Sequence, residues 1–406
     1  MDRFLTWGVV LLIACVSLVP FRFLAFAPPF GNVANYLPVL LILTLVSVLM
    51  LLRREIFLAM LKRDVLLGAI VAFVVADLLG SVGGVNSMHS LSRSVYYFLT
   101  GPLIYWVVSC GFRGVGQTRL LLITVSAFSG LAALYGVSEY ASGGNWLFRS
   151  ALSIANPKFA AATGGAEFTG RILGTVGHPV VFGAVLLLSL PASLYLASSP
   201  SPARPLGIVA ASTAAMAMVL TFSRGAFISL AIAASAWVVE RPPGQSGKAT
   251  VWRALIVGAF LVVGGTMVLT TRGAYAEFVE RYDTNPRFLA YAHTAILLPE
   301  HLMTGSGTGT FRWLGKPLGS RLDATDNMFL TRLIESGVFG LATLLYLLHR
   351  LYTGLAASSR EKRLFFAVLL GVAADMMTFD LLSWPATRSW FWIQVAVGMG
   401  VTREQT

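Results

Sequence analysis

The sequence predicts an all-α, polytopic membrane protein, and three observations lead to this fold class. Hydrophobic residues make up 56% of the chain and charged residues only 12%, whereas soluble domains carry about a quarter charged residues. The mean hydropathy is +0.75. The apolar residues also fall into long runs between short polar segments, and many runs approach the about 20 residues that a helix needs to cross a bilayer.

About twelve of these runs are expected to be transmembrane helices. The division is least clear within 205–239, where only Phe222 to Gly225 separates two runs. The first run contains LIAC, which is similar to a lipoprotein processing box, but it stays apolar to about Phe26 and is therefore interpreted as a first transmembrane helix. The expected helix cores are 4–26, 36–52, 65–82, 95–111, 119–138, 172–197, 205–222, 225–239, 252–271, 326–348, 363–383 and 388–402.

The basic residues predict how these helices are oriented. Lys and Arg gather in one set of short loops, as in Arg53, Arg54 and Lys62, and are fewer in the alternate loops. Cytoplasmic loops carry the excess of basic residues in membrane proteins. Both termini are therefore expected in the cytoplasm, and the two longer loops, 139–171 and 272–325, on the outer face.

Charge and cysteine usage narrow the function classes. The formal net charge is +12, which in a soluble protein would favour nucleic-acid binding. The charges here sit singly between apolar runs, so that class is disfavoured. Cys15 and Cys110 both fall inside apolar runs, which predicts neither a disulfide framework nor a thiolate metal site. We expect no metal ion and no cofactor.

Three arginines share one setting at the edges of apolar runs or in the long outer loop. Arg171 lies in RILGTVGHP, Arg224 in TFSRGA and Arg287 in NPRFLAYAHTAILLP. Charge in or near hydrocarbon is costly and marks functional positions. Guanidinium groups bind phosphate oxygens in a bidentate way. Because the predicted orientation puts all three on the outer face, they are interpreted as one site for an anionic, lipid-linked ligand, above all a pyrophosphate.

The outer loop 272–325 is expected to contain a surface helix. Asn285 and Pro286 form a typical helix start, and the apolar residues that follow recur at helical spacing. Arg287 falls in the first turn, where free backbone N–H groups favour an anion; snorkelling at the interface is the structural alternative. Gly305 to Gly309 is not a nucleotide loop and is expected to form a tight turn near a ligand or packed helices.

Charged residues within the apolar runs leave a second function class open. Arg332 and Glu335 are three residues apart and could pair on one helix face. Asp77, Asp375 and Asp380 would suit a proton path in a secondary transporter. Transporters usually show two similar halves, and the first six runs are not repeated in the last six.

The order of these motifs resembles the O-antigen ligase and O-antigen polymerase superfamily. RILGTVGHP is followed by TFSRGA, by a long outer loop ending in PEHLMTGSGTGTF, and by DNMFLTRLIESGVFG. The resemblance covers about 171–348. It implies a C-type glycosyltransferase-like fold in a single integral membrane domain, 1–406, with N-terminal helices in 1–138 and a large extracytoplasmic loop, 272–325, between helices nine and ten.

The resemblance also implies an activity and a location. Members are similar to metal-independent glycosyltransferases of the bacterial inner membrane, with the active site facing the periplasm. They take a glycan from undecaprenyl pyrophosphate. Polymerases pass it to another lipid-linked repeat unit in O-antigen or exopolysaccharide assembly, ligases to the lipid A core in lipopolysaccharide biosynthesis, and some relatives to protein. A non-catalytic binder of lipid-linked glycans is a further alternative.

Site residues follow from the matching positions. The functional arginines of the family correspond to Arg224, Arg171 and Arg287, and Arg281 competes with Arg287 for the last position. The family histidine that serves as base for the acceptor hydroxyl is replaced here by Asp326. This departure favours a polymerase over a ligase.

The identity of the base stays open at this point. Aspartate is a weak base because its reference pKa is about 3.9, and Asp326 also stands where an N-cap residue is expected. His293 and His301 of the outer loop are alternative bases. His178 reads equally as an ordinary helix start, and His349 falls on the cytoplasmic side.

Overall fold

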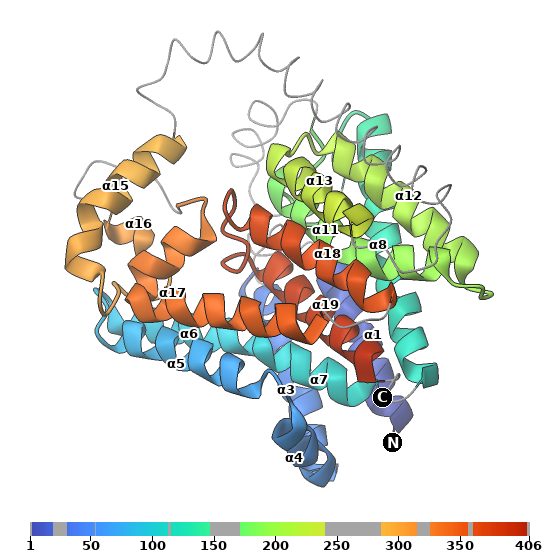
Figure 1. Cartoon of the computed structure of the whole chain (residues 1–406), viewed down its shortest axis with the longest axis horizontal. Coiled ribbons are helices and arrows are strands. Elements are labelled where there is room, and N and C mark those ends of the chain that lie inside the picture. The colour runs from blue at the N-terminus through green and yellow to red at the C-terminus, as the bar shows by residue number, and fades with distance from the viewer. Residues whose placement is uncertain are drawn as a thin grey trace. The chain divides into compact units, whose positions relative to one another are not determined.

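The computed structural model describes residues 2–18, 31–52, 54–112, 115–146, 171–239, 286–314, 325–355 and 360–403. Within these ranges every regular element is a helix (Figure 1). The chain divides into two compact units, each assembled from separate segments. The first unit comprises Met1–Leu61, Leu99–Phe227 and Pro385–Thr406, and the second comprises Lys62–Phe98 and Ile228–Trp384.

The first unit is organised around α11 (Pro179–Ser198), whose residues are mostly buried. It packs against α8 (Val115–Ala141), α12 (Arg204–Leu220) and α19 (Pro385–Arg403). Large aromatic side chains, including Trp390, Trp392 and Phe182, are fully buried there. The remaining helices are α1 (Asp2–Leu18), α3 (Gly31–Leu52), α4 (Arg54–Arg63), which crosses the boundary between the units, and α7 (Pro102–Gly111).

The second unit pairs α5 (Leu67–Val82) with the long α17 (Met328–Leu355). The two run antiparallel, because Arg350 bonds the carbonyl of Val65 while Asp77 meets Arg332. The unit also contains α6 (Ser87–Leu99), most of α13 (Arg224–Val239), α15 (Pro286–His301), α16 (Phe311–Leu314) and α18 (Arg360–Asp375).

Among the described residues, three helices are long and apolar enough to cross a membrane: Gly116–Ala141, Pro179–Ser198 and Met328–Leu355. Five shorter apolar helices accompany them in this part of the chain, at Phe4–Leu18, Leu37–Leu52, Leu67–Val82, Arg204–Leu220 and Arg224–Trp237. The described residues are thus all-helical, as expected, and consistent with a membrane protein. The total of about twelve crossings stays a prediction, and the expected helix 252–271 lies outside the described residues.

Three expected helix cores are shorter or divided in the structure, two of them at glycine or proline residues. The core 172–197 begins as a helix only at Pro179, because Gly174 and Gly177 have positive φ and proline favours the first helical position. The core 95–111 is divided into α6 and α7 just before Pro102, since the residue before proline avoids helical geometry. The core 363–383 ends as a regular helix at Asp375.

Candidate functional site

Arg171 and Arg224 lie at the same turn of the first unit. The non-helical segment 171–178 runs past the end of α12, where the N–H of Ile172 donates to the carbonyl of Leu220 over 3.2 Å. The Nε of Arg171 donates to the carbonyl of Thr221 over 2.8 Å. Arg224 follows Thr221 by three residues and begins α13. Two arginines 53 positions apart in the chain are thus brought to one helix break.

This turn, 221–223, is tight and polar. Phe222 has a φ of 49°, a region that non-glycine residues adopt uncommonly. The Thr221 hydroxyl donates to the carbonyl of Met218 over 2.7 Å and accepts the N–H of Ser223 over 3.2 Å. The Arg224 side chain is exposed. A positive side chain at the N-terminus of a helix, where the helix dipole is also positive, suits an anionic ligand.

A buried carboxylate that sequence reasoning missed holds the other side of segment 171–178. Glu139 of α8 accepts the N–H of Leu173 over 2.9 Å and the N–H of Gly174 over 2.8 Å, one through each carboxylate oxygen. Thr175 donates through its hydroxyl to the carbonyl of Ser17 over 2.8 Å. The segment that carries Arg171 is therefore bound by α1, α8 and α12. A single glutamate directly after an apolar run, at the start of the expected outer loop 139–171, was the available signal.

The start of α17 corrects one interpretation of Asp326. The N-cap is Asn327, whose Oδ1 accepts the N–H groups of Phe329 and Leu330 over 3.0 and 3.1 Å. Its Nδ2 also donates to the carbonyl of Met377 over 3.0 Å. Asp326 is not the cap. It precedes the cap with a φ of 51°, a conformation that costs energy in a non-glycine residue and that clusters at functional sites.

Asp380 lies close to Asp326 within the second unit. Asp380 is 2% exposed, and its carboxylate accepts the Thr331 hydroxyl over 3.0 Å. Thr331 shares a hydrogen bond of 2.6 Å with Thr325, whose hydroxyl in turn donates to the carbonyl of Asn327 over 2.8 Å. Asp326 and Asp380 are close enough to repel each other. The start of α17 thus holds two neighbouring carboxylates, and Thr331 and Thr325 connect that of Asp380 to the backbone of the helix start.

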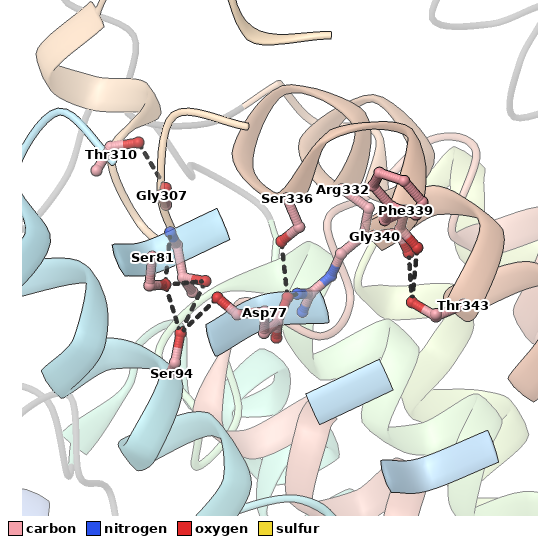
Figure 2. A network of polar contacts seen from close by, with 11 residues as sticks. Asp77, Ser81, Ser94, Gly307, Thr310, Arg332, Ser336, Phe339, Gly340 and Thr343 are labelled. Atoms are coloured by element: carbon pink, nitrogen blue, oxygen red, sulfur yellow. Dashed lines mark hydrogen bonds and ion pairs between the residues drawn. The ribbon is translucent and has the colours of Figure 1, made fainter. Parts of the chain in front are cut away.

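A second polar cluster surrounds Arg332 in the interior of the second unit (Figure 2). Arg332 is 1% exposed and forms an ion pair with Asp77 of α5. The same Asp77 oxygen accepts the Ser336 hydroxyl over 2.7 Å. The guanidinium also lies over the Phe73 ring, 4.7 Å from its centroid. The ion pair of Arg332 is with Asp77 of α5, while Glu335 on the same helix lies close enough to attract the guanidinium and also accepts the N–H of Gly309.

The glycine-rich segment 305–309 is a tight turn against packed helices, as predicted. Gly305, Gly307 and Gly309 all have positive φ, which only glycine adopts at little cost. The segment bonds to α17 through Ser306 N–H to the Ile334 carbonyl, 2.9 Å, and Gly307 N–H to the Glu335 carbonyl, 2.8 Å. Beside it, Thr308 joins Ser81 and Ser94 in a buried hydroxyl cluster. Figure 2 shows Ser81 and Ser94 side by side.

The remaining candidate residues lie on or before α15. This helix begins at Pro286, as predicted. Arg287 is its second residue; the side chain of Arg287, and Arg281 altogether, lie outside the described residues. His293 is half-buried within α15 and His301 is its last residue. Arg171 and Arg224 belong to the first unit, whereas Asp326, His293 and His301 belong to the second. In the described ranges, no group of three or more His, Cys, Asp or Glu residues is arranged to hold a metal ion.

These features define a helical, multi-pass membrane protein with arginines at a helix break and acidic residues at a helix start. A family model described as O-antigen ligase matches residues 209–345. This range includes Arg224 and Asp326, and the match supports the resemblance to the O-antigen ligase and polymerase superfamily. A search of the curated proteins found no match.

Proposed function

We propose that the protein is a metal-independent glycosyltransferase that moves a glycan from undecaprenyl pyrophosphate to an acceptor hydroxyl. The reaction takes place at the periplasmic face of the bacterial inner membrane, without a cofactor, during assembly of a surface polysaccharide. The observation that carries this proposal is the hydrogen bond from Arg171 to Thr221, beside Arg224. It joins the arginine segment 171–178 to a helix break inside the region that matches the O-antigen ligase family.

The arginines are proposed to act on the donor. When the bond between the sugar C1 and the pyrophosphate oxygen breaks, negative charge develops on the leaving group. Arg171 and Arg224, with Arg287 or Arg281, stabilise that charge as it forms, which is the role that preorganised donors play in catalysis. The Nε of Arg171 is bound to Thr221, so the plane of its guanidinium is set before the ligand arrives. The fork of its two terminal nitrogens is the edge that a phosphate meets in a bidentate complex.

Asp326 is proposed to act on the acceptor. The acceptor hydroxyl oxygen attacks C1, the bond from C1 to the pyrophosphate oxygen breaks, and the hydroxyl proton passes to the Asp326 carboxylate. Three observations support this assignment: Asn327 supplies the cap, Asp326 has a positive φ, and Asp380 lies nearby.

A polymerase is proposed in preference to a ligase. The support is the aspartate at position 326, where ligases of this family carry histidine. On this proposal the acceptor is a second lipid-linked repeat unit rather than the lipid A core or a protein, and both substrates reach the site from the membrane.

Deletion of the gene, followed by gel analysis of surface and lipid-linked glycans, tests the proposal. Loss of a polymerase leaves single repeat units in place of chains, whereas loss of a ligase leaves long chains on the carrier lipid. Carrier-linked units that stay on the inner leaflet would instead indicate a transporter. Complementation with Arg224→Lys separates an enzyme from a non-catalytic binder, because lysine keeps the charge but loses the bidentate geometry.

A further inference from the structure

The carboxylate of Glu139 occupies a position that is unfavourable without compensation. Glu139 is 5% exposed and lies two residues before the end of α8. A negative side chain there faces the negative end of the helix dipole. Burial of a carboxylate is also costly unless hydrogen bonds replace the lost water. The compensation comes from outside the helix, through the backbone N–H groups of Leu173 and Gly174.

Gly174 is held at both of its backbone groups. Its N–H binds Glu139, and its carbonyl accepts Nδ2 of Asn145 over 3.0 Å. The hydroxyl of Tyr135 in turn donates to Oδ1 of Asn145 over 2.5 Å. Gly174 has a φ of 59°, and a Cβ there would meet the ring of Phe182 at 2.6 Å. The backbone is therefore fixed at this residue, and only glycine fits.

Arg171 lies three residues before this fixed point. Ile172 binds Leu220 on the other side, so the segment is clamped between α8 and α12 within three residues. Consecutive Cα atoms are 3.8 Å apart, and so short a link transmits a shift at Gly174 to Arg171. We propose that Glu139 is a positioning residue that sets the guanidinium of Arg171 for the pyrophosphate of the donor lipid. This proposal rests on the donor role given to Arg171 under the proposed function.

The test is a double-mutant cycle on binding of undecaprenyl pyrophosphate to the purified full-length protein in lipid nanodiscs. Glu139→Gln keeps the size of the side chain but removes one acceptor and the charge. We expect roughly tenfold weaker binding, because hydrogen bonds to charged groups contribute on this order. Ser138→Ala is the matched control: Ser138 is the exposed neighbour on α8 and bonds only within its helix. It should bind the carrier like the unmodified protein.

The cycle separates positioning from a general bracing role. If Glu139 acts through Arg171, then Glu139→Gln should have no further effect in the Arg171→Ala background, because coupled residues are non-additive. Equal losses in both backgrounds would overturn the proposal and leave Glu139 as a brace of the fold. Glu139→Gln could lower the unfolding temperature too far for binding to be measured. Tyr135→Phe then serves instead, because it removes the bond to Asn145, which holds Gly174, and leaves the carboxylate in place. Its effect on binding should likewise disappear in the Arg171→Ala background.

Different results would contradict the donor role of Arg171 and the positioning role of Glu139. If Arg171→Ala binds the carrier like the unmodified protein, Arg171 is outside the donor site, and both the donor assignment and the positioning role are wrong. If Arg171→Ala weakens binding while Glu139→Gln and Tyr135→Phe do not, only the positioning role is wrong.

Discussion

Asn327 caps α17, and Asp326 directly before it adopts a φ of 51°. Asp326 was expected to be the base, the N-cap or both, and the structure gives the cap to Asn327. The side chain of Asn327 serves the helix, while Asp326 is held in a conformation that is unfavourable for a residue with a Cβ. Substitutions at the two positions should therefore have different consequences.

Asp326→Asn should fold normally and lose glycan transfer. Asparagine tolerates positive φ better than most residues, so the backbone is retained while the proton acceptor is lost. General-base help is typically worth about 100- to 10,000-fold in rate. Transfer of labelled repeat units by purified protein measures the loss. Normal transfer by Asp326→Asn, with loss in His293→Ala or His301→Ala, would assign the base to α15 instead.

Asn327→Ala should lower stability rather than chemistry. Loss of an N-cap costs about 1 kcal/mol, and the bond to the Met377 carbonyl is lost as well. Thermal unfolding in detergent should show the decrease, while the variant that remains folded transfers glycan at close to the normal rate. A hundredfold loss of transfer without loss of stability would contradict the division of roles.

Arg224→Ala should abolish glycan transfer without loss of protein from the membrane. The exposed side chain contributes little to packing, whereas loss of one donor to transition-state charge costs about 3 kcal/mol, or on the order of a hundredfold in rate. Arg224→Lys should restore little of it. Arg171→Ala should also be severe, and Arg281→Ala compared with Arg287→Ala identifies the third arginine. Near-normal transfer by Arg224→Ala would make this residue structural.

Removal of one partner of the Arg332–Asp77 pair should destabilise the protein strongly. An isolated buried charge costs about 3–5 kcal/mol, whereas replacement of both partners by apolar residues is often tolerated. Arg332→Met and Asp77→Leu should each lower the unfolding temperature, and the double variant should regain much of it. Additive losses in the double variant would indicate that the two side chains contribute independently.

Gly337→Ala should destabilise the second unit. Gly337 has a φ of 68°, and a Cβ there would meet the carbonyl of Met303. Its ψ is −167°, and this region of backbone conformation is essentially restricted to glycine and costs other residues about 1–3 kcal/mol. Gly68→Ala is the control, since a Cβ at this exposed position of α5 meets nothing within 4 Å. It should be neutral or stabilising by roughly 0.5–1 kcal/mol, as measured by thermal unfolding.

Cysteine labelling tests the orientation. Glu300→Cys should react with a membrane-impermeant maleimide in intact cells with a permeable outer membrane, whereas Glu55→Cys should react only after the inner membrane is opened. Both glutamates are exposed, and the native Cys15 and Cys110 are buried. The opposite pattern would reverse the predicted topology.

The sequence was sufficient for the fold class because helices buried in a membrane require an apolar composition and long apolar runs. Helix starts with strong signals, such as Pro286, were also predictable. The irregular stretches were not, since apolar residues fill them as well: Ile172 and Leu173 are buried in a non-helical segment. Hydropathy alone cannot distinguish this segment from a helix.

Contacts between residues far apart in the sequence could not be predicted either. The spacing of three residues indicates that Arg332 could pair with Glu335, but the ion-pair partner in the structure, Asp77, is 255 positions away. The same holds for Glu139, whose hydrogen bonds reach 34 and 35 positions along the chain. Arg171 and Arg224 were predicted to share one face of the membrane, and their common turn became visible only in the structure.

The last helix of the chain completes the first unit. α19 packs against α7, α8 and α11 and supplies the buried Trp390 and Trp392. During synthesis, this unit therefore cannot close until α19 has been made, although most of its other helices were made much earlier. Until then its apolar faces are available to chaperones or to wrong helix partners, as in other proteins that fold through intermediates. The packing of α8, whose Glu139 holds the segment of Arg171, is thus completed late in the biogenesis of the protein.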